Sequence, residues 1–154
     1  MTAHTGDIAA LRLQLLIAHP LGDLAPYFRG LRAGRAIASR CPACARTWFP
    51  PRPDCPDHRR GVDWVELPGT GRVVSVTFTE TALPFGTGPA PRSFALIAME
   101  GAENQAFGRL VTPNGSAVEG RRVWITRAAG DWPHPAQAAI YVFDEQARQT
   151  EPLP

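Results

Sequence analysis

The sequence predicts a mainly β protein in which short N-terminal helices and a zinc ribbon precede a five-stranded barrel of the OB type. Three observations support this fold class. Cysteine and histidine residues form two closely spaced pairs between residues 41 and 58, and the apolar residues change to a period of two after residue 72. The 154 residues also include 14 glycines and 16 prolines, spread along the chain, which favour a loop-rich β protein over a helical bundle.

Residues 1–34 are expected to form two short helices, over 7–18 and 23–33. Apolar residues recur at helical spacing in the first segment. In the second segment, Asp23 is suited to the N-cap, and Gly34 stands where a glycine commonly ends a helix. The apolar stripe of the first helix must be buried, either against its own domain or by docking onto another subunit.

Residues 35–67 are predicted to form a zinc ribbon that ends in an extended link, residues 62–67. Two similar units, Cys41-Pro-Ala-Cys44 and Cys55-Pro-Asp-His58, are separated by ten residues and place two ligand pairs as tetrahedral zinc requires. The alternative, three unrelated buried cysteines and a surface histidine, is disfavoured because the two units match. The histidine argues against an iron site with four thiolates. Four protein ligands leave no open position, which indicates a structural metal.

The ribbon segment, residues 35–61, is too short and too rich in proline to bury a core of its own. Metal binding is therefore expected to order it. Trp48 and Phe49 lie between the two ligand pairs and are expected to form an apolar cap on this small loop.

Residues 68–144 are predicted to form the OB-fold, and residues 145–154 a flexible polar tail. A tight turn at 100–103 follows the second strand, whereas the other connections are longer. Five strands also suit a half-barrel or a small sandwich, but the order of short and long connections favours the barrel. The five predicted strands cover 73–79, 94–99, 106–111, 123–126 and 139–143.

The charge balance excludes strong unspecific attraction to nucleic acid or to an anionic membrane, because the formal net charge is only +2. All sixteen basic residues are arginine. No apolar run is long enough to span a membrane, and the N-terminus lacks the pattern of a signal peptide. Three cysteines in a metal-site spacing suit a reducing compartment, so a cytoplasmic protein is expected.

The order of these parts resembles the domain-of-unknown-function 35 family. That family combines N-terminal helices, a rubredoxin-like zinc ribbon and an OB-fold, and it is described as acyl-CoA-associated. In this chain the fourth ligand position, usually a cysteine, is His58. The resemblance covers roughly residues 22–144 and depends on Tyr27-Phe28, Gly30-Leu31, Gly34, Arg40-Cys41-Pro-Ala-Cys44, Phe49-Pro50-Pro51-Arg52, Cys55-Pro56, Trp64-Val65, Gly69-Thr-Gly71, Val73–Thr79 and Val118–Val123.

The resemblance implies a non-catalytic accessory subunit with structural Zn²⁺. Members look like obligate partners of thiolase-fold enzymes of lipid metabolism: thiolases, synthases, acyltransferases and aldolases. Hydratase-type acyl-CoA enzymes are also implied as partners. In such hetero-oligomers the small protein stabilises the catalytic subunit and can contribute to the path of the CoA-linked substrate.

The residues themselves indicate no independent catalysis. Once the three cysteines are assigned to the metal, no thiol nucleophile remains, and His4, His19 and His134 have no recognisable motif around them. Binding of single-stranded nucleic acid is the alternative function, because zinc ribbons and OB-folds also serve it. It is disfavoured by the small net charge and by strand aromatics that are expected to be mostly core residues: Phe78, Phe94, Phe107, Trp124 and Phe143.

Two features are candidates for contact with a partner or with CoA. Phe85 lies on a long, proline-rich connection between the first two strands and is expected to be exposed. Arginines crowd around the ribbon and could bind CoA phosphates or acidic residues of a partner, the alternative being a solvated basic surface. These arginines are Arg40, Arg46, Arg52, Arg59 and Arg60.

Overall fold

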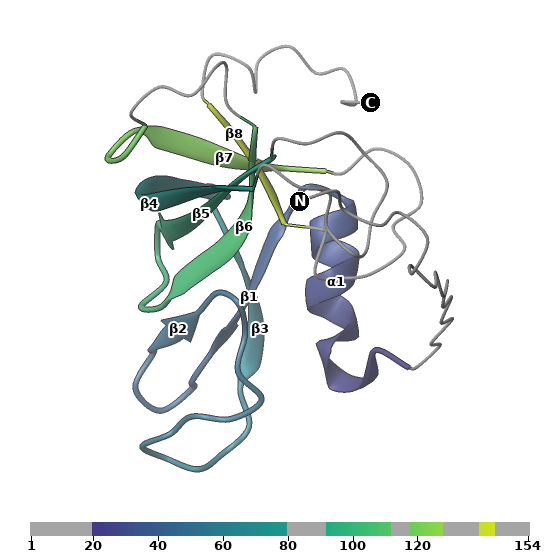
Figure 1. Cartoon of the computed structure of the whole chain (residues 1–154). Helices are drawn as coiled ribbons and strands as arrows, with labels where there is room; N and C mark the ends of the chain where they lie inside the picture. Colours follow the sequence, from purple (N-terminus) through teal and green to yellow (C-terminus); the bar gives the residue numbers. More distant parts are fainter. Residues whose placement is uncertain (1–19, 80–91, 112–117, 128–138, 144–154) are drawn as a thin grey trace, which may run out of the picture.

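The computed structural model describes residues 20–79, 92–111, 118–127 and 139–143 (Figure 1). Within these ranges the protein is mostly β, with one short α-helix and a closed barrel, so the predicted fold class is confirmed. The predicted helix over 7–18, the predicted tail, the three histidines outside the ribbon and Phe85 lie outside the described residues. None of the helices in the described ranges has the length and apolarity needed to span a bilayer.

The helical part consists of a single 3-10 turn, η1 (Gly22–Leu24), followed by α1 (Ala25–Arg32). The prediction that Asp23 caps the helix is wrong: Leu24 occupies the N-cap and makes no side-chain hydrogen bond there. Asp23 instead lies within the 3-10 turn, because the chain is already turning before α1 begins. The predicted glycine at the helix end is confirmed, since Gly34 has φ +69°.

Gly34 also allows a close approach between the helix end and the barrel. A Cβ atom at this position would lie 2.9 Å from the backbone nitrogen of Arg127. Glycine is therefore required here both by its left-handed backbone and by the space that is left.

The ribbon contains a three-stranded antiparallel sheet, formed by β1 (Ala36–Arg40), β2 (Thr47–Trp48) and β3 (Asp63–Leu67) in the order β2-β1-β3. The expectation of an extended link at 62–67 understated the role of that segment. All five residues of β3 pair with β1, from Ala36 opposite Leu67 to Arg40 opposite Asp63. Pairing with a distant strand leaves no local signal in the sequence, because the paired residues are 23 to 31 positions apart in the chain.

The barrel is closed, with the strand order β4-β5-β6-β8-β7 and with β4 paired to β7. All five predicted strands are present, each within three residues of its expected bounds. One pair, β6 with β8, is parallel, and the others are antiparallel. The strands are β4 (Thr70–Thr79), β5 (Arg92–Met99), β6 (Gln105–Val111), β7 (Arg122–Thr126) and β8 (Ile140–Phe143).

One buried cluster joins the helix, the ribbon sheet and the barrel. Tyr27 and Leu31 of α1 and Leu67 of β3 belong to the same cluster as Ile97 and Tyr141 of the barrel. The ribbon sheet and α1 therefore share the hydrophobic core of the barrel. In Figure 1, α1 lies beside β1, on the side of the molecule away from β4 and β5.

The prediction that the strand aromatics are mostly core residues is wrong. Phe78 and Phe107 are 49% and 57% exposed, and Phe94 and Trp124 are half-buried. Only Phe143 is fully buried among the five. The error has a physical cause: these strands carry apolar residues on both faces, so a period of two does not tell which face is inside.

Candidate metal centre

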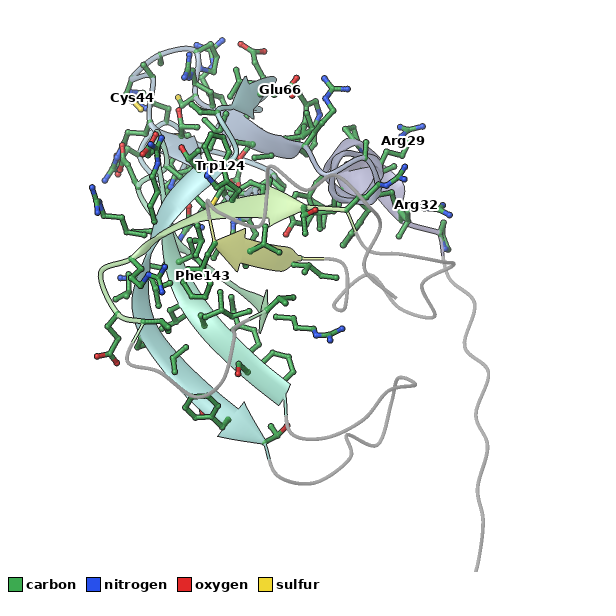
Figure 2. All side chains as sticks on the ribbon, turned by 90° about the horizontal axis from the view of Figure 1, so that it is seen from above. Arg29, Arg32, Cys44, Glu66, Trp124 and Phe143 are labelled. Atoms are coloured by element: carbon green, nitrogen blue, oxygen red, sulfur yellow. The ribbon has the colours of Figure 1, made fainter. Side chains whose placement is uncertain are left out.

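The four predicted ligands meet at one point of the ribbon. One ligand atom from each of Cys41, Cys44, Cys55 and His58 lies within 4.8 Å of the other three. Two of the thiols, those of Cys41 and Cys55, are fully buried, whereas His58 lies at the exposed side of the group. Four such residues could hold a metal ion. Figure 2 shows Cys44 in the ribbon, away from Arg29 and Arg32 of α1.

The backbone forms the same turn around each ligand pair. In the first turn the Cys41 amide donates to the Arg46 carbonyl at 2.9 Å, and the Ala45 amide donates to the Cys41 carbonyl at 2.9 Å. In the second, the Cys55 amide donates to the Arg60 carbonyl at 3.1 Å, and the Arg59 amide donates to the Cys55 carbonyl at 2.8 Å. The sequence match between the two units thus corresponds to two equivalent knuckles.

Both knuckles use a left-handed residue at the same position. Ala45 and Arg59, each four residues after the first cysteine of its pair, have φ of +59° and +47°. A side chain is disfavoured in this conformation by roughly 1 kcal/mol or more. The turns form nevertheless, which indicates that the two backbone hydrogen bonds and the converging ligands outweigh the strain.

The spacing of the ligand atoms fits a tetrahedral site. A zinc site with bonds of about 2.3 Å to sulfur and about 2.0 Å to nitrogen has edges of ~3.8 Å between sulfurs and ~3.5 Å between sulfur and nitrogen. The Sγ atoms of Cys44 and Cys55 are 3.9 Å apart. Nδ1 of His58 lies 3.4 Å from Sγ of Cys55 and 3.8 Å from Sγ of Cys41. These three distances match the edges of a zinc tetrahedron, and all four ligand atoms lie within 4.8 Å of one another, so the residues present fit a zinc ion.

The electrostatic setting favours a thiolate at Cys41. Burial alone would raise the pKa of this thiol, but the amide groups of Cys44 and Ala43 and the adjacent thiols outweigh burial and lower its pKa to about 7. The Ala43 amide lies 3.4 Å from the sulfur. At Cys44 the Arg46 amide acts to lower the pKa, yet burial and the neighbouring thiols raise it. The Cys41 thiol therefore loses its proton most readily, and a cation that binds at the site would displace the protons of the other two thiols.

Trp48 and Phe49 were expected to cap the ribbon together, and the structure separates their roles. Trp48 is buried against Cys41 and Cys55, as the cap was predicted to be. Phe49 is fully buried in the core shared with α1 and the barrel, where its ring lies 5.5 Å from the ring of Tyr27. Consecutive side chains of an extended segment point in opposite directions, so only one of the two reaches the metal cluster.

The loop after the first knuckle is hydrogen-bonded to the turn between β5 and β6. Asn104 accepts from the Phe49 amide at 2.7 Å and donates to the Pro50 carbonyl at 3.1 Å. The Glu103 amide also donates to the Thr47 carbonyl at 2.9 Å. Neither Glu103 nor Asn104 was predicted to have this role, because a polar pair in a tight turn carries no sign of a distant partner in the sequence.

The five arginines near the ribbon are all exposed, but they are not equivalent. Arg46 forms ion pairs with Asp57 of the second knuckle and with Glu103 of the barrel turn, so it links three segments. Arg40 donates to the Thr47 hydroxyl at 3.0 Å, and the guanidinium of Arg52 lies 6.0 Å from the centre of the Trp48 ring. Arg59 and Arg60 belong to the second knuckle itself. The expected basic patch is therefore used in part for internal contacts.

Solved structures of similar fold are known. No protein-family model and no curated protein matches the sequence. A solved chain described as "Ltp2-ChsH2(DUF35) aldolase" aligns with a TM-score of 0.60 and 25% identity, over 79% of this chain and 94% of that chain. A DUF35 family protein of unknown function from Sulfolobus solfataricus aligns with a TM-score of 0.55 and 21% identity, over 77% of this chain and 83% of that chain.

Proposed function

We propose that this chain, which carries a DUF35-like domain, is a non-catalytic accessory subunit that binds and stabilises an acyl-CoA enzyme of the thiolase or aldolase type. The observation that carries the proposal is the structural similarity to the DUF35 chain described together with the Ltp2 aldolase. That relative is named as part of an assembly with an enzyme. A chain of the same architecture is suited to the same coarse role.

The use of the described thiols and imidazole at the candidate metal centre suits a non-catalytic role. Within the ranges that the structure describes, every cysteine and histidine belongs to the candidate metal centre. Four protein ligands close a tetrahedral shell and leave no position for a water or a substrate. In this proposal the metal is structural Zn²⁺, held by Cys41, Cys44, Cys55 and His58, and it supplies folding free energy to the ribbon.

The finer parts of the proposal concern CoA and the class of partner. The exposed ribbon arginines suit contact with CoA phosphates, so the subunit would contribute to the path of the CoA-linked substrate. Arg59 and Arg60 are the best candidates, because Arg46 is engaged with two carboxylates. A hydratase-type acyl-CoA enzyme is the second candidate class of partner. The two classes are distinguished by which enzyme is recovered with the protein.

The experiment is affinity purification of the tagged full chain from its native host, with elemental analysis of the same material. Recovery of a thiolase-fold enzyme or a hydratase in stoichiometric amount, with about one zinc per chain, would support the proposal. Recovery of the protein alone, or with nucleic acid, would overturn the accessory role. Less than roughly half an equivalent of zinc, without prior chelation, would overturn the metal assignment.

A further inference from the structure

We infer that the outer face of β4, β5 and β6 is the docking surface for the partner enzyme. We call this surface the barrel platform and define it by the outward residues Ser75, Thr77, Phe94, Leu96, Phe107 and Arg109. The inference is built on the proposed accessory function. It adds which surface of this chain contacts the partner, and what chemistry the contacting surface of the partner has.

The strand register places these side chains side by side. Ser75, Leu96 and Phe107 occupy one row across the three strands, and Thr77, Phe94 and Arg109 occupy the next row. The residues that alternate with Phe94 and Leu96 along β5, Ala95 and Ile97, are buried in the barrel core. Alternation along a strand therefore turns the platform residues outward as a set.

The centre of the platform is aromatic and accessible. The rings of Phe94 and Phe107 stack with centroids 5.5 Å apart and an interplanar angle of 9°. Phe107 is 57% exposed, the highest value of any large apolar side chain in the described ranges, and Leu96 beside it is half-buried. Aromatic residues supply much of the binding energy of protein interfaces, because they bury a large area and have few rotamers to lose.

The charged residues of the three strands that carry the platform are of one sign. The three strands contain Arg72, Arg92 and Arg109 but no aspartate or glutamate. Arg72 and Arg109 are exposed. An apolar centre with arginine at its margin and without lysine or acidic residues matches the composition of interface cores. The complementary surface is apolar at its centre and carries carboxylates around it.

Two other occupants fit less well. A second copy of this chain, placed face to face on the platform, would bring the same arginines toward one another. Single-stranded nucleic acid needs free ring faces and a strong positive field, but Phe94 and Phe107 stack on each other, and the net charge of the chain is only +2. A protein with an apolar, acidic surface satisfies both features. In Figure 1, β4 and β5 lie on the side of the molecule away from α1.

The test uses the enzyme that co-purifies with the wild-type chain, expressed and purified separately, and measures its dissociation constant by calorimetry. Phe107→Asp is expected to weaken binding by about 30-fold or more, the scale of an interface hot spot. Arg109→Glu is expected to weaken binding by about 10-fold and to reduce its dependence on salt. The matched control is Phe78→Asp. Phe78 is a similarly exposed aromatic residue, but its register position belongs to the inner side of β4. The dissociation constant of this variant is expected to change by less than about threefold.

Each variant must keep its zinc content and its thermal unfolding transition. Footprinting of the wild-type complex by hydroxyl radicals gives a second readout that needs no variant. Oxidation of Phe94 and Phe107 should fall on complex formation, whereas Phe78 should stay reactive. Unchanged oxidation of Phe107 in the complex would overturn the inference.

The outcomes separate this inference from the proposed function. If the enzyme binds Phe107→Asp as tightly as wild type, the platform inference fails and the accessory role stands. If the platform variants lose a stoichiometric partner that is not an acyl-CoA enzyme, the inference stands and the proposed function fails. Loss of a wild-type dimer in Phe107→Asp, or loss of binding to a labelled 20-nucleotide thymidine oligomer, would assign the platform to another occupant and overturn the inference. Recovery of no partner would overturn both.

Discussion

Gly108 of β6 shows how tightly the barrel interior is packed. A Cβ atom at this position would lie 2.5 Å from Cε2 of Tyr141 and 2.6 Å from the carbonyl oxygen of Ala139. The Tyr141 ring is fully buried, and the backbone of Ala139 accepts a hydrogen bond from Arg109, so neither neighbour can move freely. Glycine is needed here for space, whereas Gly34 is needed for both its backbone conformation and its space.

Gly108→Ala should therefore destabilise the protein by about 2 kcal/mol, as expected for overpacking of a dense core. The measurement is the free energy of unfolding in urea. Gly61→Ala is the matched control, because a Cβ atom at Gly61 meets nothing within 4 Å. A fall in stability of the same size in both variants would show that the close contacts of Gly108 are unimportant.

The two tyrosines of the chain both have perturbed acidity. Burial raises the pKa of Tyr27 to about 12. Burial also raises the pKa of Tyr141, and the proximity of Tyr27 adds to this rise. Among the described residues, the Tyr141 hydroxyl has no hydrogen-bond partner, so a phenolate there would have no donor to stabilise it.

A tyrosine titration should reveal this effect directly. In the unfolded chain both phenols ionise near pH 10, so the stability gained from keeping them neutral is complete below pH 10 and is lost as the pH rises through 12. Absorbance at 295 nm of the folded protein should stay low at pH 10. The same sample in denaturant should show two tyrosinates with a midpoint near 10. A folded-state midpoint near 10 would contradict the burial of these rings.

At the scale of the element, the ribbon depends on its two knuckles and their ligands. Its buried group outside the shared core contains Cys41, Cys55 and Trp48, with Cys44 and Val62 packed against them. This group is too small to order the segment by apolar burial alone. The left-handed residues Ala45 and Arg59 add strain to the same turns. Ligation of a metal is the interaction that can balance both costs.

Cys44→Ser should therefore reduce zinc content, lower the melting temperature by about 10 °C or more, and abolish assembly with the partner enzyme. The physical reason is that a hydroxyl is a poor ligand for zinc, so the ribbon loses the ion that orders it. Elemental analysis, thermal unfolding and co-purification measure the three effects. Normal assembly of a zinc-free Cys44→Ser variant would show that the metal has no structural role.

At the scale of the whole molecule, the ribbon is joined to the barrel by apolar packing and by polar contacts. Phe49 enters the core that contains Tyr27 of α1 and Ile97 of β5. The polar contacts come from the β5–β6 turn, where Asn104 binds the backbone of Phe49 and Pro50 and Glu103 pairs with Arg46. The ribbon and the barrel should therefore unfold together in one transition.

Asn104→Ala should lower the free energy of unfolding by about 1–3 kcal/mol, because it leaves a backbone amide and a carbonyl without their partner. Thermal unfolding of the zinc-bound protein, followed by calorimetry, measures the change. The control is Gln105→Ala, next in the chain and exposed. A separate low-temperature transition in Asn104→Ala would show that Asn104 is needed to couple the two parts. Unchanged stability would contradict the role assigned to it.

The local features of this protein were determined by its sequence. The positions of the five barrel strands, the four ligands at one point and the glycine at the end of α1 all follow from short-range patterns: alternation, ligand spacing and a left-handed helix end. These patterns depend on residues that are close in the chain, so they can be recognised without knowledge of the fold.

Other features were decided only by the tertiary structure. The pairing of β3 with β1, the entry of Phe49 into the common core and the binding of the ribbon loop by Asn104 join residues far apart in the chain. Phe94 and Phe107 were predicted to be core residues, but they face outward. Both faces of β5 are apolar, and only closure of the barrel selects the inner one. Local chemistry thus identified the four residues that could hold a metal ion, while long-range packing decided which aromatic rings lie on the surface.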